Sequence, residues 1–222
     1  MIVKEEKMIQ IRPLQNEDYE LVKEFVLNCH KDISNPDFFI VDDIDTALPA
    51  MFQSSGYVYG VYYNNELIAV HGVDLSRENH MRIFQHFPSY ITNKPLAEMG
   101  WTMIRKSFQR KGIASLLITE LERVISPIYD LVATVHPQNI AALKTYINRG
   151  FYGVSLNEYY GKPRVFLIKR TDFPIRCDKT VSEYLLADMC SDNFVNKNLL
   201  VGVVKKNNNY YGQFARNLEE AI

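Results

Sequence analysis

The chain of 222 residues is long enough for one domain with an appended segment, and its 47% hydrophobic residues can form a sizeable core. Its formal net charge of −1 gives no bulk electrostatic attraction for nucleic acid or for an anionic membrane. The three cysteines, Cys29, Cys177 and Cys190, are far apart in sequence. That spacing fits neither a metal site nor a disulfide framework, and it favours a reducing compartment.

The first ten residues, MIVKEEKMIQ, lack the apolar run of a signal peptide. No segment approaches the roughly 18 apolar residues that a membrane span needs. We therefore expect a cytoplasmic protein with no membrane partner and no nucleic-acid partner.

In chain order, the alternating segment 8–14 predicts a first strand, and residues 16–30 predict a helix that Asn16 caps. The helix would bury one face, made of Leu21, Val22, Phe25, Val26 and Cys29. A short helix is expected around 46–53. Residues 57–75 predict two strands that turn at Asn64-Asn65, because asparagine tolerates the positive φ of a tight hairpin.

An aromatic loop at 84–95 precedes a predicted strand at 97–106. The segment 112–125 predicts an amphipathic helix that buries Leu116, Leu117, Leu121, Val124 and Ile125. A strand at 130–137 and a helix at 138–150, closed by Gly150, come next. Two strands on either side of 161–163 then form a second hairpin. Strands and helices alternate throughout, which predicts an α/β domain with a largely continuous sheet.

The sequence pattern changes after Arg170, so we predict a main domain over 8–170 and a C-terminal extension over 171–222. The extension reads as a helix at 180–190, a strand at 199–206, a turn, and a last helix from Gly212. Its length does not indicate a separate domain, and its strand could add to a sheet edge in the same chain or in a homodimer.

The stretch QRKGIASLL, from Gln109 to Leu117, lies between a predicted strand and a predicted helix. The first N–H groups of a helix have no internal partner and carry partial positive charge, so a strand–loop–helix of this kind binds phosphate or pyrophosphate. Gly112 and Ala114 leave room for the ligand. The chain has no GxxxxGK[ST], and no GxGxxG follows the first strand, which excludes the two best-known phosphate loops.

The pattern Q/R-x-x-G-x-G/A after a strand resembles the acyl-CoA-binding motif of the GNAT (GCN5-related N-acetyltransferase) superfamily. A second segment, HPQNIAALKTYINRGF, resembles that family's other signature through Asn139, Ala142, Tyr146 and Gly150-Phe151. The resemblance covers about residues 8–170. It implies a mixed, mostly antiparallel sheet with helices on both faces, to which this chain would add a C-terminal α/β extension.

The resemblance also implies acetyl-CoA as co-substrate, with no metal. The backbone of Thr102, Met103 and Ile104 would hold the pantetheine and the carbonyl. The pyrophosphate would bind at the loop and helix start, which comprise Gln109, Arg110, Lys111, Gly112, Ile113, Ala114 and Ser115. Asn139 and Ala142 would face the cofactor on one side of their helix, although Asn139 could equally bond its own backbone.

Acyl transfer to an amine needs a base, because an ammonium with a pKa of ~10.4 has no free lone pair at neutral pH. Tyr146 would protonate the leaving thiolate. Glu98, eleven residues before Gln109, would be the base, as in the histone-acetyltransferase branch of the family. A water chain remains open as an alternative, and His136 and His71 are weaker ones. No cysteine lies in these motifs, so all three are expected to be structural.

The amine acceptor is not readable from the sequence. In this fold it is shaped by segments that correspond to 16–56, to 157–164 and to the tail, and loop aromatics are candidate wall residues: Tyr159, Tyr160, Phe84, Phe87 and Tyr90. The sequence predicts an N-acetyltransferase acting directly on a primary amine of a small molecule or peptide. Two rivals stay open, a longer acyl-CoA donor and a CoA-binding sensor without catalysis.

Overall fold

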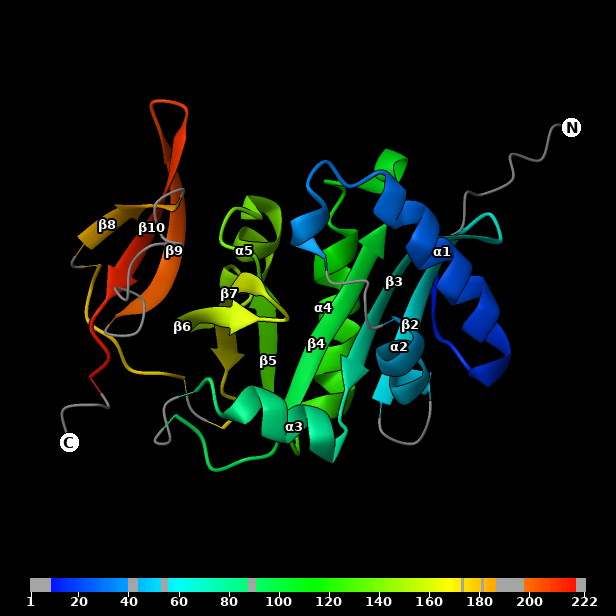
Figure 1. The fold of residues 1–222 in the computed structure, drawn as a ribbon, viewed down its shortest axis with the longest axis horizontal. Coiled ribbons are helices and arrows are strands. Elements are labelled where there is room, and N and C mark those ends of the chain that lie inside the picture. The colour runs from blue at the N-terminus through cyan, green and yellow to red at the C-terminus, as the bar shows by residue number, and fades with distance from the viewer. Residues whose placement is uncertain are drawn as a thin grey trace, which may run out of the picture.

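The computed structural model describes residues 9–39, 44–52, 56–87, 91–172, 174–180, 182–186 and 198–218. Their elements in chain order (Figure 1) are β1 (Ile9–Pro13), η1 (Asn16–Asp18), α1 (Tyr19–Lys31), η2 (Pro36–Phe38), α2 (Ile44–Phe52), β2 (Gly56–Tyr63), β3 (Glu66–Asp74), α3 (Arg77–Phe84), β4 (Leu96–Ile104), η3 (Lys106–Phe108), α4 (Ile113–Ile125), β5 (Asp130–Val135), α5 (Ile140–Ile147), β6 (Tyr152–Tyr159), β7 (Lys162–Lys169), β8 (Ser182–Leu185), β9 (Leu199–Lys206) and β10 (Asn209–Ala215).

One sheet connects all of these strands in the order β1-β2-β3-β4-β5-β7-β6-β9-β10-β8. Neighbouring strands are antiparallel except β4 and β5, which are parallel. The predicted mixed, mostly antiparallel sheet is therefore confirmed. The hairpin turns at Asn64 and Asn65, whose φ values of 49° and 62° match the conformation that the sequence predicted.

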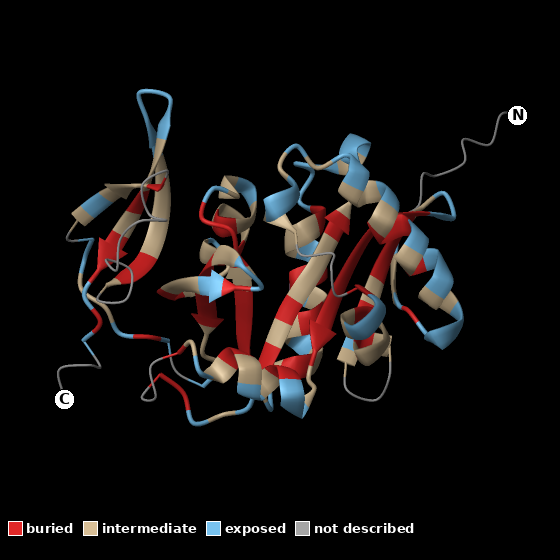
Figure 2. Cartoon of the chain, viewed as in Figure 1, coloured by how far each residue is buried: buried red, intermediate tan, exposed pale blue. Residues whose placement is uncertain are grey.

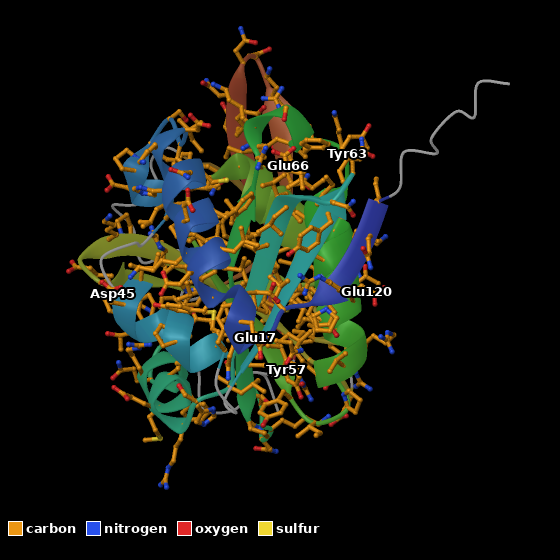
Figure 3. All side chains as sticks on the ribbon, turned by 90° about the vertical axis from the view of Figure 1, so that its right-hand side faces the viewer. Glu17, Asp45, Tyr57, Tyr63, Glu66 and Glu120 are labelled. Carbon is orange, nitrogen blue, oxygen red and sulfur yellow. The ribbon has the colours of Figure 1, made fainter. Side chains whose placement is uncertain are left out.

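Helices cover both faces of the sheet. Figure 3 shows α2, marked by Asp45, and α4, marked by Glu120, on opposite sides of the strands. The helices α1 and α2 pack with β2 and β3 around Val22, Leu48 and Val70, whereas α4 and α5 pack with β4, β5 and β7. The central strands are mostly buried and the outward faces of the helices are exposed (Figure 2).

Two helix faces differ in detail from their predictions. In α1, Val22, Phe25 and Val26 are buried, but Leu21 is 46% exposed. In α4, Leu116 is 40% exposed while its neighbour Leu117 is buried. Both leucines lie one position before the buried stripe, and a helix turns by about 100° per residue, so each points to solvent.

The predicted cap Asn16 is also wrong. The segment begins with the 3-10 helix η1, and Gln15 is its N-cap residue. The backbone N–H of Gln15 donates to Asp18 Oδ2 at 3.0 Å, which satisfies that end of the helix.

The sequence missed α3 altogether. Its residues, RENHMRIF, are mostly polar and carry a weak apolar stripe. The signal that could have found it is Ser76, whose hydroxyl accepts a hydrogen bond from the N–H of Asn79 at 3.2 Å and caps the helix.

The predicted α/β character of the extension is wrong for its described part, which is β structure. Residues 182–185, expected in a helix, form β8 and pair with β10. Residues 209–215, expected as a turn and the start of a last helix, form β10 and pair with β9. Short apolar runs fit either period, and here pairing with neighbouring strands decides. Residues 181 and 187–190 of the first predicted helix, Cys190 included, and residues 219–222 of the last lie outside the described residues.

The extension shares a core with the preceding domain. Leu200 of β9 and Phe214 of β10 are fully buried in the cluster that contains Leu143 and Tyr146 of α5. Gly153 of β6 pairs with Leu200, which joins the two parts of the sheet at one position.

Candidate active site

Strands β4 and β5 separate in the middle of the sheet. Only the first part of β4 pairs with β5, where Glu98 lies opposite Val132, the last pair of the ladder. Beyond it, β5 continues along β7 up to Val135. The β5-facing edge of β4 after Glu98 therefore has no strand partner within the described sheet, so backbone groups there are not used in a strand ladder.

A β-bulge lies in β4 beside this opening. Gly72 of β3 pairs with Gly100 and Val70 pairs with Met103, so β4 has one residue more than its partner over that interval. Trp101 sits in the bulge with a φ of 57°, an unusual value for a bulky residue. Gly100 and Trp101 consequently line the same cavity, although they are neighbours in the chain.

The start of α4 is an uncapped helix N-terminus. Gly112 is the N-cap residue, with a φ of 80°, no side-chain cap and no acidic residue in the following turn. A Cβ on Gly112 would meet nothing within 4 Å, so the space in front of the first amides is open. These features fit an anionic group bound to the backbone N–H groups of Ile113, Ala114 and Ser115.

The polar side chains of the loop before α4 are exposed, and two of them contact neighbours. Gln109 Nε2 donates to the carbonyl of Ile104 at 3.1 Å, which ties the loop to the end of β4. The Lys111 ammonium lies 5.0 Å from the centre of the Phe108 ring. Arg110 adopts a φ of 61°. The side chains of Met103 and Ile113 are buried, so these two residues could reach a ligand only through their backbone.

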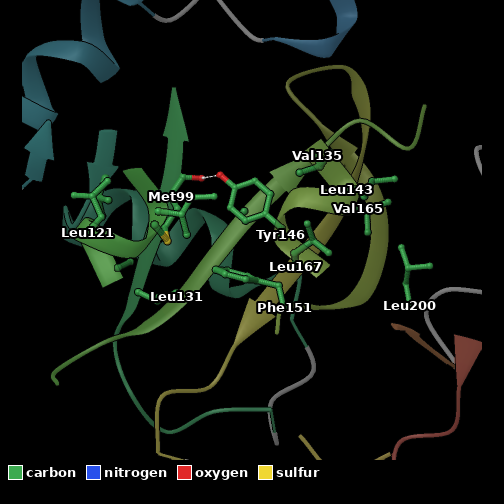
Figure 4. Packing of buried hydrophobic residues seen from close by; sticks show 14 of the residues in the cluster. Met99, Leu121, Leu131, Val135, Leu143, Tyr146, Phe151, Val165, Leu167 and Leu200 are labelled. Atoms are coloured by element: carbon green, nitrogen blue, oxygen red, sulfur yellow. Dashed lines mark hydrogen bonds between the residues drawn. The ribbon is translucent and has the colours of Figure 1, made fainter. Parts of the chain in front are cut away.

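Tyr146 of α5 reaches β4 at the opening between the strands. Its ring is buried and packs edge-on against Phe151 at 5.1 Å, and its hydroxyl points to the carbonyl oxygen of Met99 at 3.4 Å (Figure 4). Burial raises the pKa of Tyr146 to about 12, against an opposing hydrogen bond from Thr102. The phenol is therefore protonated at neutral pH, as a proton donor must be.

Thr102 also bonds His71 of β3. The Oγ1 of Thr102 forms a hydrogen bond with Nδ1 of His71, whose side chain is completely buried. Burial lowers the pKa of His71 to about 3, so its imidazole is neutral. This value argues against His71 as the base.

Glu98 faces the opposite side of β4 from Met99 and lines a cavity. Its Oε2 accepts from Asn79 Nδ2 at 2.8 Å, and its Oε1 from Thr134 Oγ1 at 3.3 Å. Burial raises the pKa of Glu98 to about 7, with a smaller contribution in the same direction from Asp74. The carboxyl group therefore exchanges a proton close to neutral pH, which suits a general base.

Two other sequence candidates are bound to local backbone. The Oδ1 of Asn139 accepts from the N–H of Ala142 at 3.2 Å and caps α5. This is the bond to its own backbone that the sequence left open as an alternative to a cofactor contact. His136 Nδ1 accepts from the N–H of Gln138 at 3.2 Å, and its ring packs against Phe38. His136 therefore stabilises a turn, and its pKa is lowered mainly by burial.

The cavity beside Glu98 has a volume of ≈ 100 Å³ and lies on the face of the sheet that α1, α2 and α3 cover. It is lined by Phe38, Phe39, Ala47, Met51, Asp74, Arg82, Glu98, Gly100, Trp101, Thr134, Tyr159, Tyr160 and Arg164. Tyr159 and Tyr160 were predicted as wall residues. Phe87 belongs instead to a hydrophobic cluster with Phe84 packed against it, and Tyr90 lies outside the described residues.

Sequence reasoning missed Asp74, Asn79, Arg82 and Arg164 around this cavity. Arg164 stands directly before the apolar run VFLI of β7, and nothing in the local sequence indicates that β7 brings it to this cavity. Arg82 lay in the unrecognised helix α3.

The described residues contain no cluster of three or more His, Cys, Asp or Glu side chains that could hold a metal ion. Among the described helices, none is long and apolar enough to cross a membrane. The free thiols of Cys29 and Cys177 lie outside the cavity, and burial raises the pKa of each.

Comparison with known proteins identifies the family of this chain and solved structures with the same fold. A family model described as the acetyltransferase (GNAT) family matches residues 13–151. No significant match to a curated protein sequence was found.

Solved structures share the fold at low sequence identity. An N-acetyltransferase from Staphylococcus aureus Mu50 is 19% identical with a TM-score of 0.53, over 74% of this chain and 98% of its own. FeeM, an N-acyl amino acid synthase from uncultured soil microbes, is 15% identical with a TM-score of 0.57, over 74% and 92%. PaiA N-acetyltransferase from Thermoplasma acidophilum, solved with coenzyme A, is 18% identical with a TM-score of 0.51, over 73% and 99%.

Proposed function

Because this chain belongs to the acetyltransferase (GNAT) family, whose members are acyl-CoA-dependent transferases, we propose that it moves the acetyl group of acetyl-CoA to a primary amine. The transfer is direct, within a ternary complex of the protein, acetyl-CoA and the amine. The observation that carries this proposal is the opening between β4 and β5, which lies between Tyr146 on one face and the Glu98 cavity on the other.

On the donor side, the residues of the loop and of the α4 N-terminus would bind the pyrophosphate. Their open space, their free amides and the absence of acidic residues in the first turn support this role. The backbone of Thr102, Met103 and Ile104, on the unpaired edge of β4, would hold the pantetheine and the carbonyl.

Acetyl-CoA, when bound, supplies the carbonyl carbon that the amine attacks and the thiolate that leaves. Glu98 takes the proton that the ammonium must lose before its nitrogen can form the new C–N bond. Tyr146 donates its hydroxyl proton to the sulfur as the C–S bond breaks. The nitrogen loses its second proton to water once the C–N bond has formed. Glu98 releases its proton to water and Tyr146 takes one back, so both residues return to their starting states and one proton is released overall.

Asn139 has a smaller role in this proposal than the family signature suggests. Its side-chain oxygen caps α5, which fixes the first turn of the helix that carries Tyr146. We infer that Asn139 and Ala142 act mainly by setting the position of that helix next to β4.

The experiment that tests the proposal is a thiol-release assay with acetyl-CoA and longer acyl-CoAs against a panel of primary amines, with products identified by mass spectrometry. Acetylated amine with stoichiometric CoA release is the expected result. Faster turnover with a longer acyl-CoA would mean that the donor is that acyl-CoA and not acetyl-CoA. Tight CoA binding with no turnover on any amine would mean a sensor and would reject catalysis.

A further inference from the structure

The cavity beside Glu98 contains ionisable side chains of both signs. Two carboxyl groups, Asp74 and Glu98, come from β3 and β4, and two guanidinium groups, Arg82 and Arg164, come from α3 and β7. None of the four forms an ion pair with another described residue at 4.0 Å or less. The cavity therefore brings together positive and negative groups that form no ion pair with one another within 4.0 Å.

Arg164 is the clearest case of an unmatched buried charge. Its residue surface is only 2% exposed, although arginine is almost never fully buried without a partner. Nη2 donates to the carbonyl oxygen of Asp37 at 2.8 Å, and Nη1 to that of Pro163 at 3.0 Å. Burial lowers the pKa of Arg164 to about 10, which still leaves it charged at neutral pH.

A structural role accounts for part of this arrangement. The bond to Asp37 holds η2 against β7 and so closes one wall of the cavity. A guanidinium has five N–H donors, however, and the two bonds here go to neutral carbonyls, while the Asp37 carboxylate pairs with Lys162 and acts on Arg164 only from beyond ion-pair distance. Burying such a charge costs free energy that an anionic ligand would recover.

Arg82 supplies a second, independent observation. Its Nη2 donates to Asn79 Oδ1 at 2.6 Å, and its guanidinium lies over the ring of Tyr160 at 5.0 Å. Its Nε is buried and has no hydrogen-bond partner among the described residues. Asn79 in turn bonds Glu98, so Arg82 lies close to the proposed base on the same side of the cavity.

The remaining walls are mostly aromatic. Phe38, Phe39, Trp101 and the two tyrosines of the β6–β7 turn surround the charged groups. The volume of ≈ 100 Å³ is on the scale of a small organic group. Such walls suit the apolar part of a ligand whose amine and anionic group contact the charged side chains.

We propose that the acceptor is an amino acid, that is, a small primary amine that also carries a carboxylate. Its carboxylate binds Arg164 and Arg82, its apolar body lies against the aromatic walls, and its amine points to Glu98. This inference rests on the proposed function, and the product would be an N-acetyl amino acid, formed with the same bond changes and proton transfers.

The test compares matched ligands on the CoA-bound full chain. Phenylalanine is paired with phenethylamine, and 6-aminohexanoate with pentylamine, because in each pair the carboxylate alone is replaced by hydrogen. Calorimetry gives the dissociation constant of each, and thiol release gives kcat and KM. We expect the amino acid of at least one pair to bind roughly tenfold to a hundredfold more tightly than its partner, the range for a hydrogen bond to a charged group.

Two variants locate the carboxylate. Arg164→Gln and Arg82→Gln are each expected to remove most of that preference, because each should raise the KM for the amino acid far more than the KM for the matched amine. Lys162→Gln is the control, because Lys162 precedes Arg164 by two residues, pairs with Asp37 and does not line the cavity. Circular dichroism checks that each variant folds. If Arg164→Gln does not fold, Arg82→Gln still tests the proposal.

The outcomes separate the two proposals. Three results would overturn the amino-acid assignment. Both members of each pair could bind equally, neither member could bind, or every folded arginine variant could keep the preference for the carboxylate. Turnover on simple amines in that case would leave the acetyltransferase proposal intact. Carboxylate-dependent binding without any thiol release would support the amino-acid assignment of the cavity and would reject the acetyltransferase proposal. Faster acetylation of a peptide than of any amino acid would also overturn the assignment.

Discussion

The carboxyl group of Glu98 titrates close to neutral pH because its surroundings disfavour the charged form. Burial raises its pKa to about 7, and the hydrogen bonds from Asn79 and Thr134 reduce this effect only in part. A base must be deprotonated to act, so kcat/KM should rise with pH through about 7 and then level off.

Glu98→Gln should remove that rising limb and lower kcat roughly a hundredfold, within the range for losing a general base. The measurement is a pH–rate profile for wild type and variant under thiol release. Glu120→Gln on the outer face of α4 is the control, and it should leave the profile unchanged (Figure 3). If the limb survives in Glu98→Gln, a water chain without Glu98 serves as the base.

Tyr146→Phe removes one hydroxyl and keeps the ring that packs against Phe151. We expect kcat to fall about tenfold to a hundredfold, because the leaving thiolate loses its proton donor. Affinity for acetyl-CoA should stay within a few-fold, measured by calorimetry. An equal loss in both quantities would make Tyr146 a binding residue instead of a proton donor.

At this scale, the sequence was informative where a residue belongs to a linear motif. Glu98 could be named from its spacing to the glycine loop and Tyr146 from the second family signature, and both lie beside the opening in the sheet. Arg82 and Arg164 could not be named, because α3 and β7 bring them to one cavity only after folding. For Asn139 the motif position did not fix the role, since it left a helix cap and a cofactor contact equally open.

At the scale of elements, local pattern predicted most of the main domain, because its amphipathic helices and hairpins have clear periods. It failed for α3, whose apolar stripe is weak, and for β8 and β10, whose short apolar runs fit a helix as well as a strand. The separation of β4 and β5 and the bulge at Trp101 depend on pairing between strands distant in sequence, which no local signal contains.

The contact between β6 and β9 depends on the absence of a side chain at Gly153. A Cβ there would lie 2.8 Å from the Cβ of Leu200 and 3.0 Å from Cγ1 of Val165. Gly153→Ala should therefore lower the free energy of unfolding by about 1–3 kcal/mol, measured in urea. Gly100→Ala is a matched control, since its Cβ would meet nothing within 4 Å. Equal stability of the two variants would show that β9 moves aside freely.

At the scale of the molecule, we propose that residues 171–222 complete the core of the main domain. Leu186, Leu200 and Phe214 are buried in the cluster that holds Tyr146, and Leu200 lies at its edge in Figure 4. Each such side chain stabilises the fold by about 1.5–3 kcal/mol, against a total of about 5–15 kcal/mol for a typical protein.

Truncation after Arg170 should therefore lower the melting temperature sharply and abolish acetyl transfer. Thermal unfolding followed by circular dichroism, together with size-exclusion chromatography, measures the effect. A truncated chain that melts cooperatively at the wild-type temperature would contradict the shared core. In that case a change in oligomeric state would assign the extension to subunit pairing.

The most direct test of the whole account is calorimetric titration of acetyl-CoA into wild type, Gly112→Glu and Gly161→Glu. Both glycines have positive φ values, 80° and 68°, and open space for a Cβ, so the two substitutions strain the backbone alike. Only Gly112 stands at the start of α4, where a carboxylate would occupy the proposed pyrophosphate site. The account predicts tight binding to wild type and Gly161→Glu, and none to Gly112→Glu. Unchanged affinity in Gly112→Glu would contradict it.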